Sequence, residues 1–326
     1  MLLEGSASRS AVQTTPCPGC GGGERELYRA GFYQLDGEKL DLWRCKECGL
    51  VSVWPRPLPA RHAALLDSEE FYDRGYAQGL RERGYFDRRD EWLDQYDREW
   101  EQLEEHVGYV GRVIEWGCGG GFFAEAARRR GWLVRCRETR KRAAEYATVE
   151  FPLEVHAGPL DESPWQPASF DVAVLHGVLP YCADPAAPLR ELQRFTRPGG
   201  TLLVTVPAYV NSGWMRNLHR SRKLWSTGLL GGELHAALKL EQDHGAPFCL
   251  QHFDRGSLTG LVERCGWKVE QVRGGMPRPD FLFERRNLNL RETLLRGAFA
   301  ALGGGMRAGM LPPTELRLLA TRPLEA

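Results

Sequence analysis

The apolar residues of the chain fall into short runs that alternate with segments of helical spacing. Five of these runs end near Glu115, Glu138, His156, His176 and Pro207. Between them lie glycine turns or stretches in which apolar residues recur every three or four positions. Strands that alternate with helices in this order predict an α/β fold with a parallel sheet. Two further runs, 267–272 and 314–322, predict a last pair of strands that are antiparallel to each other.

A different pattern covers the segment before the first of these strands. Residues 61–107 are dense in charged and aromatic side chains, and apolar residues recur there at helical spacing, at Trp92, Leu93, Tyr96, Trp100 and Leu103. This spacing predicts a helix with one packed face. A functional interpretation, compatible with the packed face, is that the segment forms a lid over a neighbouring pocket.

The length of 326 residues suits one large domain with an appended module. A proline-rich stretch at 54–59 predicts a stiff, extended linker. We therefore expect an N-terminal module with its linker (1–57), a helical connector or lid (58–107) and a large domain (108–326). Insertions at about 208–247 and 274–313 interrupt the large domain.

Opposite charges balance over the whole chain, which carries 43 basic and 43 acidic side chains. Proteins that depend mainly on attraction to phosphates usually carry a basic excess, so the balance counts against a nucleic-acid partner but allows a local basic patch. No stretch approaches the roughly 18 apolar residues of a transmembrane helix, and the N-terminus lacks the features of a secretory signal. We expect a cytoplasmic protein without membrane association. The sequence leaves its oligomeric state open.

Four of the nine cysteines form two tight pairs, Cys17-Pro-Gly-Cys20 and Cys45-Lys-Glu-Cys48. Each CxxC turn places two thiolates together, and the glycine that follows relieves the crowded backbone. Two such turns supply four sulfurs in a tetrahedron, which suits a structural zinc ion. Strand-like stretches around a turn at Asp36-Gly37 indicate a zinc ribbon. Two disulfides or free thiols are the alternative, which a reducing compartment disfavours.

Residues 110–131 predict a strand, a glycine-rich loop and a helix in succession. The strand ends at Glu115, and a helix rich in alanine and arginine follows the loop. The loop contains Gly117, Cys118, Gly119 and Gly121. Glycines let the backbone pass close to a ligand, and a helix N-terminus offers free N–H groups. A dinucleotide fingerprint would require glycine where Phe122 stands, so that interpretation fails.

The loop sequence VIEWGCGGG instead resembles the first motif of class I S-adenosylmethionine-dependent methyltransferases, which commonly reads (V/L)L(E/D)xGCGxG. FDVAVLHGVLPYCADP (170–185) and RPGGTLLVTVP (197–207) resemble later motifs of the family, in the same order. The resemblance spans about 110–273 and, less tightly, 315–322. It implies a doubly wound, mostly parallel seven-stranded sheet of the Rossmann-like methyltransferase kind, an enzyme, and S-adenosylmethionine as the cofactor.

The resemblance also assigns residues to the cofactor site. It implies that Glu115 helps order the glycine loop and engages the amino end of the cofactor. Glu138, at the end of the next strand, would accept hydrogen bonds from both ribose hydroxyls, although a solvated surface acid is the alternative. Leu160 or Asp161 is expected beside the adenine. His176, at the carboxyl end of a strand, is expected to contact the cofactor or the substrate.

Two positions depart from the family pattern. Relatives often carry Glu-His where this chain has Pro180-Tyr181, and a histidine where it has Cys249, with His252 three residues later. Tyr181 is a candidate for substrate contact, and His252 is a candidate for presenting an imidazole at the mouth of the active site. A packed or surface histidine is the alternative for His252. Methyl transfer depends mostly on positioning the acceptor, and a base is needed only if the acceptor must lose a proton early.

The first insertion contains a basic run, RNLHRSRK, and both insertions are expected near the acceptor pocket. The run points to an anionic acceptor, with a solvated helix face as the alternative. Similar CxxC modules precede this fold in bacterial methyltransferases of sugar, glycan and natural-product pathways, so we expect a small-molecule acceptor. Two other hypotheses are an RNA base methyltransferase that binds RNA through its ribbon, and a non-catalytic scaffold that binds the cofactor.

Overall fold

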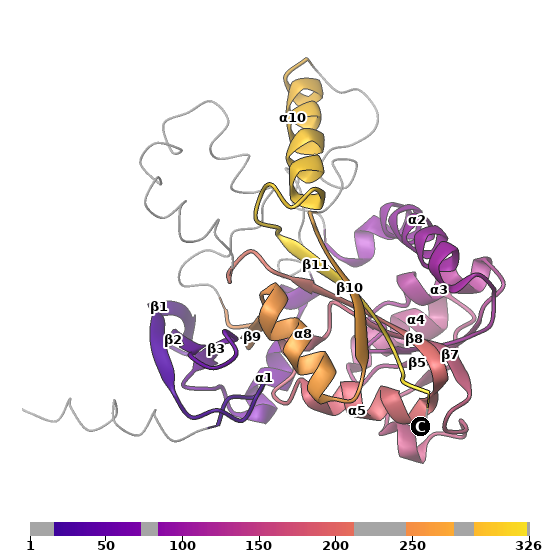
Figure 1. Cartoon of the computed structure of the whole chain (residues 1–326), viewed down its shortest axis with the longest axis horizontal. Coiled ribbons are helices and arrows are strands. Elements are labelled where there is room, and N and C mark those ends of the chain that lie inside the picture. The colour runs from indigo at the N-terminus through magenta and orange to yellow at the C-terminus, as the bar shows by residue number, and fades with distance from the viewer. Residues whose placement is uncertain (1–15, 73–83, 212–245, 277–289, 325–326) are drawn as a thin grey trace, which may run out of the picture.

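Two sheets organise the protein in this computed structural model, which describes residues 16–72, 84–211, 246–276 and 290–324 (Figure 1). The larger sheet has seven strands in the order β10-β11-β8-β7-β4-β5-β6. They are β4 (Arg112–Trp116), β5 (Leu133–Arg137), β6 (Val155–His156), β7 (Phe170–His176), β8 (Thr196–Pro207), β10 (Lys268–Gly275) and β11 (Glu315–Thr321). Neighbours from β6 to β8 are parallel, and β11 is antiparallel to both β8 and β10. The predicted sheet is confirmed.

The winding direction of the chain reverses between β4 and β7. From β4 the strands are added outward through β5 to β6, and the chain then returns to form β7 on the other side of β4. In an open α/β sheet, ligands bind outside the carboxyl ends of the strands at such a reversal. The glycine-rich loop follows β4 and His176 ends β7, so both lie at this point.

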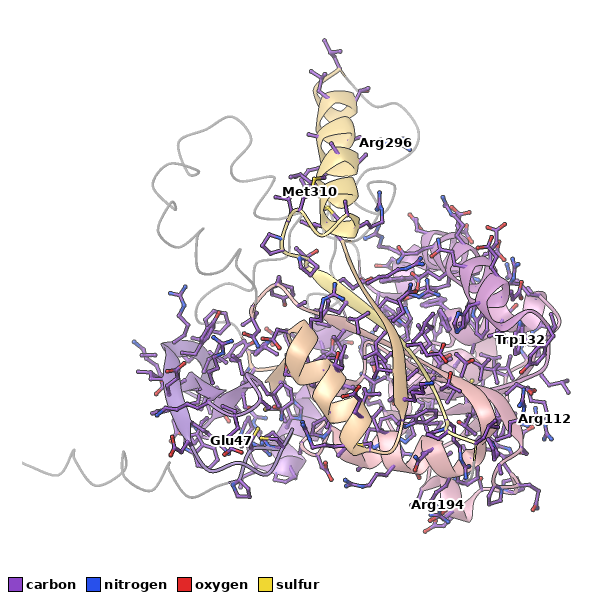
Figure 2. All side chains as sticks on the ribbon, in the orientation of Figure 1. Glu47, Arg112, Trp132, Arg194, Arg296 and Met310 are labelled. Carbon is purple, nitrogen blue, oxygen red and sulfur yellow. The ribbon has the colours of Figure 1, made fainter. Side chains whose placement is uncertain are left out.

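Helices cover both faces of the larger sheet. On one face lie α5 (Ala186–Phe195) and α8 (Arg255–Arg264). On the other lie α2 (Arg89–Val107), α3 (Phe122–Arg129) and α4 (Lys141–Glu150). All five apolar residues that predicted the helix of the connector are buried in α2. Trp132, labelled in Figure 2, donates its indole N–H to Glu104 of α2 at 2.9 Å. The predicted packed face of this helix is confirmed.

The smaller sheet is the N-terminal ribbon, with the order β1-β2-β3-β9. β1 (Arg25–Leu35) and β2 (Glu38–Cys45) form a hairpin whose turn, Asp36-Gly37, has positive φ at both residues, as two-residue hairpin turns favour. β3 (Val51–Trp54) follows, and the helix α1 (Pro59–Leu66) comes after it. The fourth strand, β9 (Gln251–His252), comes from the segment before α8 and pairs antiparallel with β3. A strand of two residues has no periodic signal, so the sequence did not predict it.

Polar contacts join the ribbon to the rest of the protein. Arg264 of α8 donates two hydrogen bonds to the carbonyl of Gly19, at 2.6 and 3.0 Å. The amide of Asn211 donates to the carbonyl of Gly49 at 2.9 Å. An apolar cluster continues from β1, β2 and β3 to residues of α10 (Leu290–Arg307), such as Phe299. The ribbon therefore packs against the larger unit through both polar and apolar contacts.

Parts of the two predicted insertions lie outside the described residues. These parts include the basic run RNLHRSRK and the arginines at 278, 285 and 286. Within the described segments, none of the helices combines the length and the apolar character that crossing a membrane requires.

Candidate active site and metal centre

The glycine-rich loop after β4 makes a tight turn through three left-handed residues. Gly117, Gly119 and Gly121 have φ angles of 78°, 56° and 78°, which residues with a Cβ rarely adopt. Space is also short, because a Cβ on Gly117 would lie 2.8 Å from Val178, and one on Gly121 would lie 2.6 Å from Leu153. The GxGxG spacing therefore reflects three backbone positions that this turn requires.

A tyrosine of the connector covers the loop. The hydroxyl of Tyr85 accepts a hydrogen bond from the N–H of Gly120 at 3.2 Å. A Cβ on Gly119 would lie 2.9 Å from that hydroxyl. The ring of Tyr85 lies edge-on to Phe122, the first residue of α3, at 5.1 Å. The sequence suggested a lid in this segment, but only its high aromatic content pointed toward Tyr85, and no pattern singled this residue out.

Glu115 is enclosed at the end of β4, with an exposed fraction of 2%. Its Oε2 atom has no hydrogen-bond partner among the described residues. Burial raises the pKa of the carboxyl to about 7, against the opposing effect of the nearby His176 charge. Leaving a buried carboxylate oxygen without a donor costs free energy. The ammonium group of S-adenosylmethionine would supply such a donor, so the residues at this end of the site fit the cofactor.

Glu138 follows β5 and is also 2% exposed, which excludes the solvated alternative. Its carboxylate accepts the backbone N–H of Gly119 at 2.8 Å and that of Arg140 at 2.9 Å. The Arg140 guanidinium donates two more hydrogen bonds, at 3.0 and 3.1 Å. Burial alone would raise the pKa of Glu138, but the charge and hydrogen bonds of Arg140 hold it below its usual value. Glu138 thus connects the end of β5 to the glycine loop.

His176 forms a charged pair with a residue of the connector. Its Nε2 donates to Oε2 of Glu99, in α2, at 3.2 Å. The imidazole also lies 4.9 Å from the Tyr96 ring and 4.8 Å from the Phe123 ring. Burial lowers the pKa of His176, but the hydrogen bond and charge of Glu99 raise it more, so the net shift is upward. The sequence reasoning missed Glu99, which is 77 residues away along the chain.

The strand register aligns the ends of three strands. Trp116 of β4 is opposite Arg137 of β5, so Glu138 lies beside Gly117. Glu115 of β4 is opposite Val174 of β7, so His176 lies beside Gly117 from the other side. The structure therefore brings together Glu115, the glycine loop, Glu138 and His176 at the reversal of the sheet.

For three other residues predicted for the cofactor site, the structure shows contacts with other parts of the protein itself. The thiol of Cys118 is buried in the core, where its sulfur lies 3.7 Å from the carbonyl oxygen of Gly119. The side chain of Leu160 is fully buried, in the cluster that includes α5 and α8, and its N–H donates to Glu191 at 2.7 Å. Asp161 forms an exposed ion pair with Arg194 at 2.7 Å. Their predicted contacts with the cofactor stay predictions.

The two candidate catalytic residues have different surroundings. Tyr181 ends the short helix η5 (Leu179–Tyr181), is partly buried, and meets the ring of Phe71 edge-on at 5.4 Å. His252 lies in β9 of the ribbon, is 4% exposed, and shares a hydrogen bond of 3.2 Å with the hydroxyl of Tyr33. Burial lowers the pKa of His252 to about 3. These surroundings favour the packed alternative for His252, and the role of Tyr181 in substrate contact stays a prediction.

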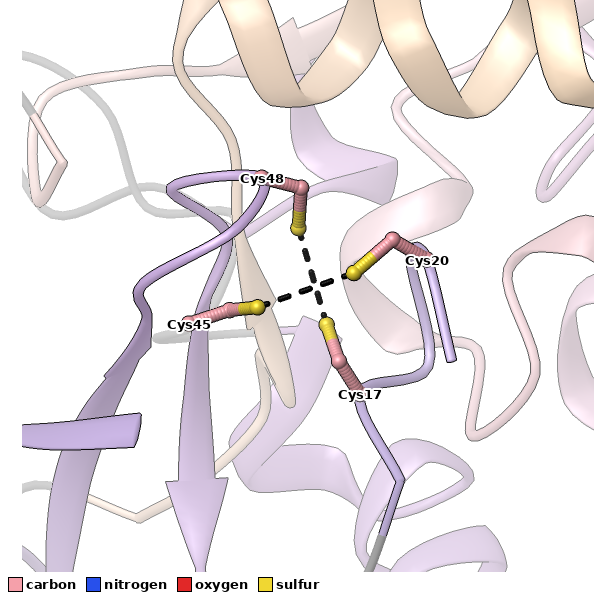
Figure 3. Close-up of side chains that lie close together, drawn as sticks. All are labelled: Cys17, Cys20, Cys45 and Cys48. Atoms are coloured by element: carbon pink, nitrogen blue, oxygen red, sulfur yellow. Dashed lines mark hydrogen bonds between the residues drawn. The ribbon is translucent and has the colours of Figure 1, made fainter. Parts of the chain in front are cut away.

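The four cysteines of the ribbon lie in one cluster (Figure 3). All of their sulfur atoms are within 4.8 Å of one another. The sulfurs of Cys17 and Cys48 are 3.6 Å apart, as are those of Cys20 and Cys45. A tetrahedral zinc ion with Zn–S bonds of about 2.3 Å separates its ligand sulfurs by about 3.8 Å, whereas a disulfide bond measures about 2.05 Å. The cluster fits a metal ion and does not fit disulfides.

Backbone geometry explains why the cysteines converge. The N–H of Gly21 donates to the carbonyl of Cys17 at 2.8 Å, and that of Gly49 donates to the carbonyl of Cys45 at 3.0 Å. Both glycines have positive φ, of 79° and 76°. Each CxxC segment therefore forms the same tight turn, and the strand β2 brings the second turn next to the first.

Known proteins resemble this chain in the larger unit. Residues 114–204, from β4 into β8, match the protein family described as a methyltransferase domain. With the seven-stranded sheet, the glycine loop and the two acidic strand ends, this match identifies the larger unit as a class I S-adenosylmethionine-dependent methyltransferase domain.

Relatives of known name share part of this domain. A malonyl-[acyl-carrier protein] O-methyltransferase of Erwinia pyrifoliae is 31% identical over 106 residues, which are 32% of this chain and 40% of the relative. A ubiquinone biosynthesis O-methyltransferase of Ralstonia nicotianae is 26% identical over 173 residues, which are 50% of this chain and 65% of the relative. An S-adenosylmethionine-dependent methyltransferase structure from Mesorhizobium loti has 20% identity and a TM-score of 0.45, and the match covers 71% of this chain and all of the other. The chain thus spans less than two thirds of these two named relatives.

Proposed function

We propose that this protein transfers the methyl group of S-adenosylmethionine to a small-molecule acceptor, such as a sugar, a glycan precursor or a natural-product intermediate. The observation that carries the proposal is the buried Glu115 oxygen without a donor, beside the glycine loop and Glu138 in a methyltransferase domain. A bound sulfonium cofactor supplies an activated methyl group. The chain has to hold the cofactor, orient the acceptor and exclude water.

Each residue of the site has a proposed task. Glu115 would hold the ammonium of the cofactor, and Glu138 would accept its ribose hydroxyls. Tyr85 covers the loop between them and would limit the access of water. The charged pair of Glu99 and His176 occupies the β7 side of the reversal, where it would face the reacting end of the cofactor. Tyr181 would contact the acceptor.

We also infer that Cys17, Cys20, Cys45 and Cys48 hold a structural zinc ion. The support is the distance between their sulfurs and the absence of a fifth protein ligand in the cluster within the described segments. A closed site of four thiolates has no open coordination position, so its task would be to fix the ribbon rather than to take part in the chemistry.

The proposal is tested first by calorimetric titration with S-adenosylmethionine and S-adenosylhomocysteine. Binding of both is expected, and failure to bind either would contradict the proposal. The second test supplies radiolabelled S-adenosylmethionine together with one of two acceptor pools, a small-molecule filtrate or total RNA. Label in the filtrate is the expected result. Salt-sensitive labelling of RNA would favour the RNA alternative, and binding without transfer to either pool would favour a scaffold.

The names of the relatives bear on the acceptor. They refer to malonyl-[acyl-carrier protein] and to ubiquinone biosynthesis, and the second name supports an acceptor from a biosynthetic pathway. A structure with S-adenosylhomocysteine bound would then show the size and charge of the cavity that faces the sulfur.

A further inference from the structure

A chain of polar side chains joins helix α2 to the carboxyl end of β7. The side-chain amide of Gln95 donates to Oε1 of Glu99 at 2.9 Å, and Oε2 of Glu99 accepts the Nε2–H of His176 at 3.2 Å. The side chains of Glu99 and His176 are only 15% and 18% exposed. Burying charged groups costs free energy, and ionisable groups in such surroundings gather at functional sites, so this chain points to a function.

Glu99 decides which nitrogen of His176 carries the hydrogen. Burial raises the pKa of Glu99, but the hydrogen bond and charge of His176 lower it more, so its carboxylate only accepts hydrogen bonds. Nε2 of His176 therefore keeps its hydrogen in the neutral imidazole, and the lone pair lies on Nδ1. The rings of Tyr96 and Phe123, at 4.9 and 4.8 Å, hold the imidazole from two sides.

Nδ1 of His176 is open to a ligand. Within the described residues this nitrogen has no hydrogen-bond partner, and it stays accessible to water. His176 ends β7 beside Gly117, at the reversal of the sheet where α/β proteins of this kind bind ligands. A basic nitrogen that is open on one side and oriented by a carboxylate on the other is the arrangement that activates nucleophiles in enzymes.

The charged groups around His176 favour its uptake of a proton. Burial lowers the pKa of His176, but Glu99 of α2, Glu115 of β4 and Glu315 of β11 raise it more. Arg317 of β11 also lies near this group, and its charge favours the ionised forms of Glu99 and Glu315. The three acids stabilise the imidazolium that forms when Nδ1 takes a proton, which makes His176 a stronger base than a free imidazole.

We propose that His176 is the general base of the reaction, that its Nδ1 takes the proton from a hydroxyl group of the methyl acceptor, and that Glu99 positions the imidazole. This inference rests on the proposed methyl transfer, and it assigns the acceptor to the alcohols or phenols. The hydroxyl oxygen bonds to the methyl carbon while the bond between sulfur and that carbon breaks and its electron pair stays on sulfur. The proton moves to Nδ1 and passes to water after the product leaves.

The pH profile of methyl transfer tests the role of His176, with saturating radiolabelled S-adenosylmethionine and the small-molecule filtrate as acceptor pool. The rate of the parent should rise with pH and level off above the pKa of His176, because only the neutral imidazole accepts a proton. His176→Gln still offers Glu99 a donor but lacks a basic nitrogen. We expect it to transfer methyl groups at least about 100-fold more slowly, without the rise.

Helix α2 offers a matched control. His106, at the end of this helix, pairs with Glu270 at 3.3 Å. Glu270 belongs to β10, which β11 and β8 separate from β7. His106→Gln should keep the rate and the pH profile of the parent. A His176→Gln variant with the rate and profile of the parent would overturn the proposal.

Glu99→Gln separates positioning from a merely structural role. Loss of the carboxylate lowers the pKa of His176, so the midpoint of the rate profile should move to lower pH, together with the midpoint of the His176 imidazole resonances in NMR spectra. An NMR midpoint that falls while the midpoint of the rate profile stays fixed would overturn the proposal. If His176→Gln does not fold, as judged by circular dichroism, this variant still tests the assignment.

Two acids titrate in the same range, because the pKa values of Glu115 and Glu315 are both raised to about 7. The ammonium of the saturating cofactor would hold Glu115 ionised, so Glu315 is the acid to exclude. The rise of the rate with pH should persist in Glu315→Gln, since Glu315 acts only through its charge on His176. Loss of the rise in this variant would assign the titration to Glu315 and refute the role of His176.

The labelled product tests the class of acceptor. Mass spectrometry should place the transferred methyl group on a hydroxyl oxygen, and the label should resist mild alkali as methyl ethers do. Label released as methanol would reveal a methyl ester, whose parent carboxylate needs no base, and would contradict the inference, as would a methyl group on nitrogen. A parent protein that fails to bind S-adenosylhomocysteine or to label the filtrate would contradict the proposed function instead.

Discussion

The cysteine cluster and the candidate cofactor site of this protein are built in opposite ways. Four identical side chains form the cluster, and they come from two copies of one tight turn within residues 17–48. The cofactor site combines unlike groups from the ends of β4, β5 and β7 with residues of the connector such as Tyr85. Because the four thiolates are equivalent, we expect the loss of any one of them to disrupt the whole cluster. The cofactor site can be weakened step by step, because each group makes a separate contact.

The largest effect is expected from breaking the cluster. Cys17→Ser should release the metal and unfold the ribbon, because structural zinc contributes on the order of 10 kcal/mol to the folding of small metal modules. Metal analysis should find about one zinc ion per chain in the parent and none in the variant. Hydrogen exchange should accelerate at β1 and β2 and change much less at β4 and β7.

Cys182→Ser is the matched control, because Cys182 lies outside the cluster and a serine hydroxyl can keep its hydrogen bond to the carbonyl of Val178. A parent protein without zinc, or full protection of β1 and β2 in Cys17→Ser, would contradict the comparison.

The next largest effect concerns the pH dependence of stability. The pKa of Glu115 in the folded protein is raised from 4.5 to about 7, so its favourable contribution is complete below pH 4.5 and is lost as the pH rises through about 7. Relative to Glu115→Gln, the parent should lose about 3 kcal/mol of unfolding free energy over this window. Urea unfolding of both proteins at several pH values measures the difference. Parallel pH profiles would show that folding does not shift the pKa of Glu115, which contradicts this prediction.

The same residue links cofactor binding to a proton. If the ammonium of the cofactor lies beside Glu115, it favours the carboxylate, and binding at pH 6 should release a proton. Calorimetry of S-adenosylhomocysteine binding in two buffers of different ionisation enthalpy detects this release. Identical heats in both buffers would place the ammonium elsewhere.

A smaller effect is expected from the ribose contact. Glu138→Ala should weaken the binding of S-adenosylhomocysteine by about 1–3 kcal/mol, the usual cost of losing hydrogen bonds to a charged group. The exposed Glu145 of α4, which lies 3.8 Å from Lys141, provides the control Glu145→Ala, for which no change is expected. Unchanged affinity in Glu138→Ala would reject its role at the ribose.

The smallest effect is expected at the charged pair of α2 and β7. The folded-state pKa of His176 is raised, so the stabilisation it provides is present below pH 6.5 and declines as the pH rises through the higher folded-state value. Glu99→Gln should destabilise the protein by about 1 kcal/mol at pH 6 and by less at pH 9. The imidazole resonances in NMR spectra should show a lower pKa for His176 in the variant. A variant with the parent pKa would mean that another group, such as Glu115 or Glu315, holds the proton on His176.

The sequence predicted one site more completely than the other for a physical reason. The CxxC spacing and its glycines encode a local turn, and the ligands carry their own chemistry. For the cofactor site, the resemblance of the glycine loop and the following strand to the family motifs implied Glu115 and Glu138, and both residues lie at the carboxyl ends of strands, at one edge of the sheet. The side-chain environments were not predictable in the same way. His252 is buried against Tyr33 because β9 joins the ribbon, and no local pattern encodes that pairing.

By itself, the sequence determined the parallel sheet, the packed face of α2, the glycine turn and the four clustered thiols. All of these depend on the spacing of residues close together in the chain, which fixes backbone geometry directly. Only the tertiary structure decided that Glu99 meets His176, that Tyr85 covers Gly120, and that β9 completes the ribbon. These contacts join segments far apart in the sequence. Burial of the apolar face of α2 and of the ribbon core brings particular polar groups together, and buried polar groups need hydrogen-bond partners.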